Sequence, residues 1–191
     1  MKAAIITGAS VGIGQAAAQL FLDDGFEVYN LSRRDCPLPG VHNIGCDLAS
    51  VESVTQATTT LATAVAACDS VSIVYNASQM RKDSADACSS DDMRAVLETN
   101  VVAINSINQV LIPLLPRASS ILYIGSTLSE KAVASSFSYV VSKHAQLGMM
   151  RATCQDLMGK GIHTALICPG FTDTEMLRTH IGNDPDVVQA I

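Results

Sequence analysis

Six short apolar runs alternate along the chain with longer stretches that suit helices, and this alternation constrains the fold more than any other feature. Each run has the length of a strand, and several are rich in β-branched residues. Because parallel strands need long crossover connections, the alternation predicts βαβ units and a parallel sheet with helices on both faces. The predicted strands are 3–7, 27–31, 41–46, 71–75, 121–125 and 163–168, and the predicted helices are 12–24, 50–67, 90–115 and 138–159.

The composition limits the class of protein. A chain of 191 residues with 48% hydrophobic and 16% charged residues is not a disordered segment. A net charge of −6 without a basic run argues against nucleic-acid binding. No apolar run approaches the roughly 18 residues of a membrane span, and the N-terminus lacks the pattern of a secretory signal. We therefore expect a single cytoplasmic domain without a nucleic-acid or membrane partner.

Cysteine and histidine spacing predicts neither disulfides nor a metal site. The six cysteines contain no C-x-x-C pair, so we expect reduced thiols, most of them buried as small hydrophobic residues. The four histidines show no ligand spacing either, and no metal is expected.

A glycine-rich turn, TGASVGIG at 7–14, joins the first predicted strand to the first predicted helix. Gly8 allows a sharp turn, while Gly12 and Gly14 leave room for a phosphate and for close packing of helix on strand. The following helix presents its N–H groups and its positive dipole end to that phosphate. A purely structural turn also uses glycine, but this position is the one that a dinucleotide site requires.

The residues at the end of the second predicted strand bear on the choice of dinucleotide. A carboxylate that binds the adenosine ribose diol is expected about 20 residues past the glycines. The chain has Ser32, Arg33 and Arg34 there instead. Because guanidinium groups match phosphate geometry, NADP(H) is favoured over NAD(H). Two alternatives stay open: both arginines are solvated loop charges, or one of them pairs with Asp35.

A serine, a tyrosine and a lysine form a candidate catalytic group. Ser126 ends a predicted strand, and Tyr139 and Lys143 are four residues apart on one face of a predicted helix. An ammonium about 4 Å from a phenol contributes roughly 4 kcal/mol at an effective dielectric constant of 20. We therefore expect Lys143 to bring the pKa of Tyr139 close to neutrality, where acid–base catalysis works best. The alternatives are a strand-end cap for the serine and a surface pair for the other two.

Taken together, these motifs resemble the short-chain dehydrogenase/reductase family over nearly the whole chain. Ser78 stands where that family usually has a glycine. The motifs that carry the resemblance are TGASVGIG at 7–14, Asp47-Leu48, Asn76-Ala77-Ser78, Asn100, Ser126, Tyr139, Lys143 and PGFTDT at 169–174.

The resemblance implies a Rossmann-like, doubly wound α/β fold in three α/β/α layers, with about six parallel strands in the order 3-2-1-4-5-6. It implies an NADP(H)-dependent oxidoreductase that interconverts a small-molecule carbonyl and an alcohol. A sensor or scaffold that binds NADP without useful turnover is the alternative, although such a protein would need only the glycine turn.

The resemblance also assigns roles to residues. Tyr139 would be the acid or base, and Ser126 would donate a hydrogen bond to the substrate oxygen. Lys143 would also bind the nicotinamide ribose, and Asn100 would hold a water that links Lys143 to solvent; the alternative for Asn100 is a helix-kink residue. Asp47 would hold the adenine amino group, although read alone it is a cap for the helix near Ser50. The expected cofactor-binding residues are Gly8, Ser10, Gly12, Ile13, Gly14, Arg33, Arg34, Asp47, Leu48, Asn76, Ala77, Ser78, Tyr139, Lys143, Pro169, Gly170, Thr172 and Thr174.

The expected substrate wall is mixed and mildly apolar, and it consists of Gln79, Met80, Thr127, Leu128, Phe171, Met176 and Leu177. Family members usually pair through the helices that correspond to 90–115 and 138–159, so a homodimer is expected. Its apolar seam would comprise Ala103, Ile107, Leu111, Leu147 and Met150. We expect residues 1–191 to form one dinucleotide-binding domain that lacks the family's substrate lid and seventh strand.

Overall fold

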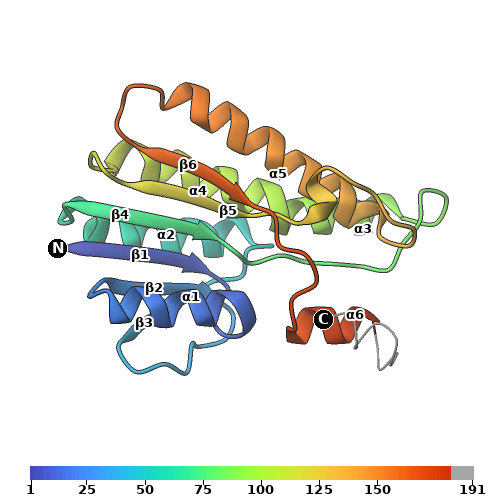
Figure 1. Cartoon of the computed structure of the whole chain (residues 1–191), viewed down its shortest axis with the longest axis horizontal. Coiled ribbons are helices and arrows are strands. Elements are labelled where there is room, and N and C mark those ends of the chain that lie inside the picture. Colours follow the sequence, from blue (N-terminus) through green and yellow to red (C-terminus); the bar gives the residue numbers. More distant parts are fainter. Residues whose placement is uncertain (182–191) are drawn as a thin grey trace.

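Six parallel strands form one sheet in the order β3-β2-β1-β4-β5-β6, which confirms the expected topology (Figure 1). The computed structural model describes residues 1–181 of the chain. Every described neighbour pair is parallel; β1, for example, places Ile5 opposite Tyr29 on one side and Ile73 on the other. The strands are β1 Lys2–Thr7, β2 Glu27–Ser32, β3 Val41–Gly45, β4 Ser70–Tyr75, β5 Ser120–Ile124 and β6 His163–Ile167.

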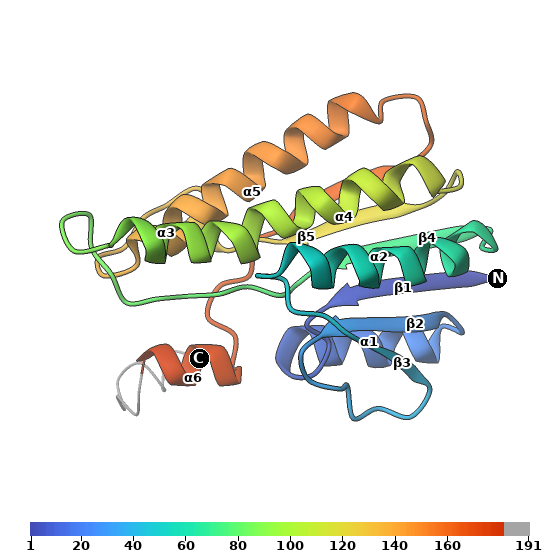
Figure 2. The same cartoon turned by 180° about the vertical axis from the view of Figure 1, so that it is seen from behind.

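Helices cover the sheet on both faces, as expected. Figure 1 shows α1 in front of the sheet, and Figure 2 shows α2, α4 and α5 over the opposite face. These elements agree with the predicted segments to within a few residues at their ends, apart from the segment 90–115. The helices are α1 Gly12–Asp23, α2 Val51–Ala66, α3 Ser90–Leu97, α4 Ala103–Leu111, α5 Phe137–Asp156 and α6 Glu175–Ile181, with short 3₁₀ turns at Ile112–Leu114 and Thr127–Ser129.

Residues on opposite faces of β1 to β5 point into two separate hydrophobic clusters. In β1, Ala3 and Ile5 pack in the larger cluster with α2 and α4, while Ala4 and Ile6 pack with α1. All four side chains are fully buried. The central strand is therefore apolar throughout, as expected for a parallel strand that is covered on both faces.

The predicted helix over 90–115 is not one regular helix. It consists of α3, a π-helical turn at Glu98–Val102, α4 and a 3₁₀ turn that contains Pro113. At the π-helical turn the N–H of Ala103 donates to the carbonyl of Glu98, five residues earlier. Such single π turns inside helices often mark functional sites. This one places Asn100 in a fully buried position.

The stretch Ser90–Leu114 is also long and apolar enough to cross a membrane, judged by length and composition alone. The sequence-based expectation of no such run was therefore too strict. The apolar side chains Ile104, Ile107 and Leu111 pack against the sheet in the larger core cluster, which accounts for the composition of this helix. A core helix passes the same test, so the observation is weak evidence for a membrane span.

Two expectations about burial are wrong. Ala103, Ile107 and Leu111 are 2%, 0% and 0% exposed inside the chain's own core, so they cannot form a dimer seam. Helix α4 uses these residues to cover the sheet. Of the cysteines, only Cys36, Cys46 and Cys68 are buried; Cys88 is half-buried, and Cys154 and Cys168 are exposed. Cys154 lies on α5, and Cys168 directly follows β6.

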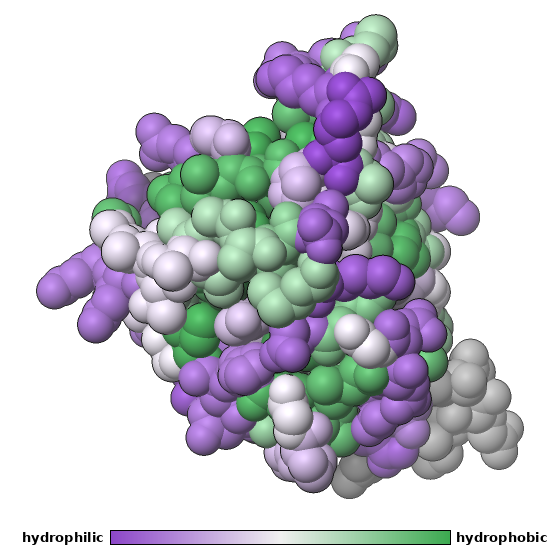
Figure 3. All heavy atoms as spheres, turned by 90° about the vertical axis from the view of Figure 1, so that its left-hand side faces the viewer, coloured by the Kyte–Doolittle hydropathy of each residue, from purple (hydrophilic) through white to green (hydrophobic). Residues whose placement is uncertain are grey.

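The two ends of the sheet differ in what they carry. Figure 3 looks onto the end at which the strands begin, where hydrophobic and hydrophilic residues are interspersed. The expected site residues follow the opposite ends of the strands: Gly8 follows β1, Asn76 follows β4 and Ser126 follows β5. Ligands of open parallel sheets bind at these carboxyl ends.

A buried polar network ties the sheet to two helices. The hydroxyl of Tyr75 donates to Asn108 Oδ1 at 2.7 Å, and Asn108 Nδ2 donates to the hydroxyl of Tyr123 at 3.2 Å. The Tyr123 hydroxyl also lies 3.1 Å from Thr153 Oγ1 of α5. Burial raises the pKa of both tyrosines, so their hydroxyls stay protonated and need partners.

Replacing Asn108 with alanine should lower the free energy of unfolding by about 3 kcal/mol, because two buried phenols lose a partner and a cavity remains. Urea denaturation measures this loss. The control is Asn105→Ala in the same helix, where the side chain is exposed and the expected change is below about 0.5 kcal/mol. Equal losses in the two variants would contradict the network's role.

Candidate functional site

A cleft of about 1390 Å³ lies along the carboxyl ends of the strands. It brings Ser126, Tyr139 and Lys143 together with the glycine turn and the loop after β6. The seven residues expected as a substrate wall also line it. Every expected cofactor-binding residue except Gly14 lines the cleft, whereas Asn100 and Gly14 lie outside its lining.

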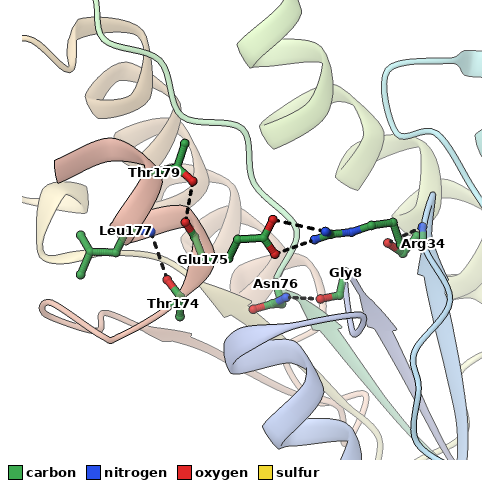
Figure 4. A network of polar contacts seen from close by, with 8 residues as sticks. Gly8, Arg34, Asn76, Thr174, Glu175, Leu177 and Thr179 are labelled. Atoms are coloured by element: carbon green, nitrogen blue, oxygen red, sulfur yellow. Dashed lines mark hydrogen bonds and ion pairs between the residues drawn. The ribbon is translucent and has the colours of Figure 1, made fainter. Parts of the chain in front are cut away.

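The glycine turn is packed so closely that side chains would not fit. Gly8 and Gly12 have φ values of +72° and +59°, in the left-handed region that favours glycine. A Cβ atom on Gly14 would lie 2.3 Å from the carbonyl oxygen of Gly8 and 2.4 Å from Asn76 Nδ2. That same amide donates to the Gly8 carbonyl at 2.9 Å (Figure 4). Asn76 therefore clamps the turn from β4, and Gly14 permits the close approach.

Helix α1 begins at this turn with its N-terminus open. Val11 occupies the N-cap position without a side-chain hydrogen bond, and the first turn holds no acidic residue. The N–H groups at this end and the positive end of the helix dipole are thus left for an anion in the cleft. Thr174 lies against the turn, since a Cβ on Gly12 would be 3.1 Å from its Cγ2.

Asn30 is a site-shaping residue that the sequence analysis missed. It is 1% exposed in β2, and its Oδ1 accepts from the N–H of Ala9 in the glycine turn at 2.9 Å. Its Nδ2 donates to Asn43 Oδ1 at 2.9 Å and to the carbonyl of Arg34 at 3.1 Å. The only sequence feature that could have identified Asn30 is its polar side chain inside an otherwise apolar strand. Asn30 ties the turn to the segment that carries the two arginines.

Lys143 is buried beside Tyr139. The lysine is 2% exposed, and its Nζ donates to the carbonyl of Ile124 at 2.8 Å and to Gln146 Oε1 at 3.0 Å. Nζ lies 5.4 Å from the centre of the Tyr139 ring. Burial lowers the pKa of Lys143 from 10.5 to about 8. The group can therefore change charge close to neutral pH.

The expected shift of Tyr139 has the opposite sign. The residue is 8% exposed, and burial raises its pKa above the ordinary value of 10.0, while the nearby hydroxyls of Ser126 and Ser78 act in the lowering direction. The expectation of a phenol close to neutrality is wrong because it counted the attraction of the ammonium and left out desolvation. Tyr139 accordingly holds its proton firmly as an acid.

Ser126 caps the 3₁₀ turn Thr127–Ser129, which is the strand-end role left open as an alternative. Its Oγ accepts from the N–H of Leu128 at 3.1 Å, and its own N–H donates to Ser129 Oγ at 3.2 Å. A hydroxyl that accepts one bond still has its proton to donate. The cap therefore orients the Ser126 oxygen and leaves its donor available to a ligand in the cleft.

Asn100 is fully buried and fastens the loop after β4. Its Oδ1 accepts from the N–H of Gln79 at 2.7 Å, and its Nδ2 donates to the Gln79 carbonyl and to Ser142 Oγ, both at 2.9 Å. The backbone carbonyl oxygen of Asn100 accepts from Gln146 Nε2 at 2.8 Å. The side chain of Gln146 connects Asn100 to Lys143 directly, and the expected water-mediated link stays a prediction. Sequence analysis did not single out Gln146.

Arg34 pairs across the mouth of the cleft, but not with Asp35. Its Nη1 and Nη2 lie 3.3 and 3.2 Å from the two carboxylate oxygens of Glu175 in α6 (Figure 4). Thr174 accepts from the N–H of Leu177 at 3.2 Å and so caps the helix that carries this glutamate. Arg33 is exposed and forms no ion pair within residues 1–181.

Asp47 lines the cleft and does not cap α2. One of its carboxylate oxygens accepts from the N–H of Ala49 at 3.0 Å. Ser50 is the N-cap, because its side chain accepts from the N–H of Ser53. The carboxylate of Asp47 therefore retains acceptor positions that face the cleft.

The cleft residues fit a nicotinamide dinucleotide. The glycine cradle and the open end of α1 suit the pyrophosphate, and the arginines suit a phosphate beyond the ribose. The hydroxyl of Ser78 lies in the cleft wall near that of Tyr139, where it acts to lower the pKa of the tyrosine. Within residues 1–181, no cluster of three histidine, cysteine or acidic side chains suits a metal ion.

Comparisons with known proteins agree with this geometry. A family model described as short chain dehydrogenase matches residues 2–184. Carbonyl reductase family member 4 from Danio rerio is 29% identical over 186 residues, which cover 92% of this chain and 77% of that protein.

Two solved structures are also similar. A short chain dehydrogenase family protein from Francisella tularensis superposes with a TM-score of 0.88 at 26% identity, over 99% of this chain and 77% of that one. A short chain dehydrogenase from Burkholderia cenocepacia in complex with NADP gives a TM-score of 0.82 at 29% identity, over 92% and 76% of the two chains.

Replacing Gly14 with alanine should cost about 2 kcal/mol of stability, because the added Cβ collides with the Gly8 carbonyl and the Asn76 amide. The distorted turn should also weaken NADPH binding at least tenfold, as measured by nucleotide fluorescence. Gly148→Ala in α5 is the matched control, since nothing lies within 4 Å of its added Cβ. A Gly14→Ala variant that binds NADPH like the Gly148→Ala variant would refute the assignment of the turn.

Proposed function

The chain belongs to the short chain dehydrogenase family of NAD(P)-dependent oxidoreductases, and on this basis we propose that it interconverts a small-molecule carbonyl and an alcohol by hydride transfer with NADP(H). One observation carries the proposal: Ser126, Tyr139 and Lys143 line the same cleft as the glycine turn. The relative from Danio rerio, a carbonyl reductase by name, supports the same reaction class.

Tyr139 is the proposed acid and base. A nicotinamide dinucleotide held in the cleft would supply the hydride for carbonyl reduction, or accept it in alcohol oxidation. In carbonyl reduction Tyr139 gives its hydroxyl proton to the substrate oxygen, and in alcohol oxidation its phenolate takes that proton back. Ser126 donates a hydrogen bond to the same oxygen, where negative charge develops as the hydride arrives.

Lys143 stabilises the tyrosine after proton transfer. Its pKa of about 8 keeps it largely protonated at neutral pH. An ammonium beside a phenolate in a buried site is more favourable than one beside a neutral phenol, so the charge assists the step in which Tyr139 loses its proton. The carbonyl of Ile124 and the amide of Gln146 hold this ammonium in place.

The substrate end of the cleft has an apolar rim. Phe171 and Met176 are 64% and 40% exposed and line the cleft together with Met80 and Leu128. A carbonyl compound with an apolar portion would cover this rim and remove it from water. The rim supports such a compound over a small, fully polar one.

The proposal extends to the location and the assembly of the chain. The six cysteines are free, which fits a reducing compartment such as the cytoplasm. A homodimer would use the outer faces of the π-helical turn and α5, where Val102 is 41% exposed and Leu147 and Met150 are half-buried. We also propose that the chain acts as one dinucleotide-binding domain.

Replacing Tyr139 with phenylalanine should reduce turnover by about 10²- to 10⁴-fold and leave NADPH affinity within about twofold, because only the acidic proton is removed. NADPH absorbance at 340 nm with a panel of aldehydes and ketones measures turnover. Tyr29→Phe, outside the cleft in β2, is the matched control and should keep full activity. Unchanged turnover in Tyr139→Phe would exclude the proposed role. NADPH binding without turnover in the unmodified protein would favour a sensor.

Replacing Glu175 with glutamine should tighten NADPH binding about tenfold and leave NADH binding unchanged. The carboxylate occupies both terminal nitrogens of Arg34 and would repel a 2′-phosphate, so its neutralisation frees the arginine. Asp156→Asn at the end of α5 removes the same charge away from the cleft and should change neither affinity. Equal affinity of the unmodified protein for NADH and NADPH would overturn the NADP(H) preference.

A further inference from the structure

The side chain of Gln146 fills the space between the catalytic lysine and the π-helical turn. It is 1% exposed, its Oε1 accepts from Lys143 Nζ at 3.0 Å, and its Nε2 donates to the carbonyl of Asn100 at 2.8 Å. We propose that Gln146 is a positioning residue for the reaction, which holds the Lys143 ammonium at Tyr139 by anchoring it to Asn100. The inference rests on the proposed roles of Tyr139 and Lys143.

The orientation of the Gln146 amide is fixed by its partners. The carbonyl oxygen of Asn100 can only accept, so the NH₂ group of Gln146 must face it. The amide oxygen is thereby turned toward Lys143, which can only donate. A flipped amide would place its NH₂ group against the ammonium and its oxygen against a carbonyl. One orientation therefore satisfies both contacts.

The anchor itself is rigid. Asn100 belongs to the π-helical turn, and its side chain makes three hydrogen bonds, two with the Gln79 backbone and one with Ser142. Ser142 in turn donates to the carbonyl of Tyr139 at 2.8 Å. The loop after β4, the π-helical turn and α5 are thus connected around the lysine. Through its hydrogen bonds to Asn100 and Lys143, Gln146 fixes the position of Nζ relative to these elements.

The ammonium of Lys143 has three N–H donors, and two are committed. One goes to the carbonyl of Ile124 and one to Gln146, which leaves one for the cleft that Lys143 lines. With two bonds fixed, rotation about the Cε–Nζ bond is blocked. The remaining donor is therefore held ready for the groups that enter the reaction.

Few charged groups surround Lys143, so the two acceptors matter for its charge state. Tyr139 faces it from the same helix, and the thiol of Cys168 faces it from the end of β6. Within residues 1–181 no carboxylate forms an ion pair with Lys143. Burial already lowers its pKa to about 8, and loss of the Gln146 oxygen would remove part of what stabilises the charged form.

The test measures the charge state of Lys143 directly. The chain has five lysines, so ¹³C-labelled lysine gives a simple NMR spectrum in which Lys143→Met assigns the resonance of interest. Titrations compare the unmodified protein with Gln146→Met and Gln146→Glu. Gln155→Met, an exposed position on the same helix, is the matched control.

Gln146→Met should lower the pKa of Lys143 by about one unit, a tenfold change in its ionisation ratio, whereas Gln146→Glu should raise it because a carboxylate then faces the ammonium. The alkaline limb of the kcat profile for carbonyl reduction should move in the same two directions. Gln155→Met should move neither quantity. A merely structural role would not produce opposite shifts in the two Gln146 variants.

An unchanged Lys143 pKa in a folded Gln146→Met or Gln146→Glu variant would overturn the inference. If Gln146→Met fails to fold, the upward shift in Gln146→Glu decides the question. A lysine pKa that shifts as expected in a protein without carbonyl turnover would contradict the proposed function and leave the positioning contact standing. Carbonyl turnover with an unshifted Lys143 pKa would contradict the positioning role of Gln146 and leave the proposed function standing. The two failures are therefore distinguishable.

Discussion

The parallel direction of the six strands is the constraint on which the rest of the structure depends. Parallel neighbours need a crossover between them, and these crossovers supply the helices that bury both faces of the sheet. The same direction places the carboxyl ends of all six strands along one edge. Each of these ends continues into a segment of the cleft, so residues far apart in sequence meet there.

At the centre of that edge the fold buries a positive charge. Desolvation of Lys143 is unfavourable, as its lowered pKa shows, and two acceptors offset part of the cost. One acceptor is the end of β5, and the other requires Gln146, which in turn requires the carbonyl of Asn100 in the π-helical turn. The irregular helix is therefore part of the site. A neutral residue would be easier to bury at this position, so the proposed catalytic role of Lys143 is opposed by its cost in stability.

The mouth of the cleft shows a second balance of charges. Arg34 extends from the end of β2 and Glu175 from α6, and their ion pair spans the region where a phosphate beyond the adenosine ribose would lie. Both side chains are more than half exposed, so the pair is weakly stabilising in water. A phosphate dianion can compete with one carboxylate for the guanidinium. The proposed NADP(H) preference therefore involves helix α6 through Glu175.

The sequence by itself determined the order of elements, their bounds to within a few residues, the glycine turn and the group of Ser126, Tyr139 and Lys143. Strand periodicity, turn glycines and i to i+4 spacing are local properties, so they can be read from neighbouring residues. Tertiary structure alone decided the π-helical turn, the Gln146 bridge, the partner of Arg34 and the raised pKa of Tyr139. Glu175 lies 141 positions from Arg34, and Gln146 lies 46 from Asn100. Contacts at such separations, and the desolvation that comes with them, depend on how the helices pack, which no local pattern encodes.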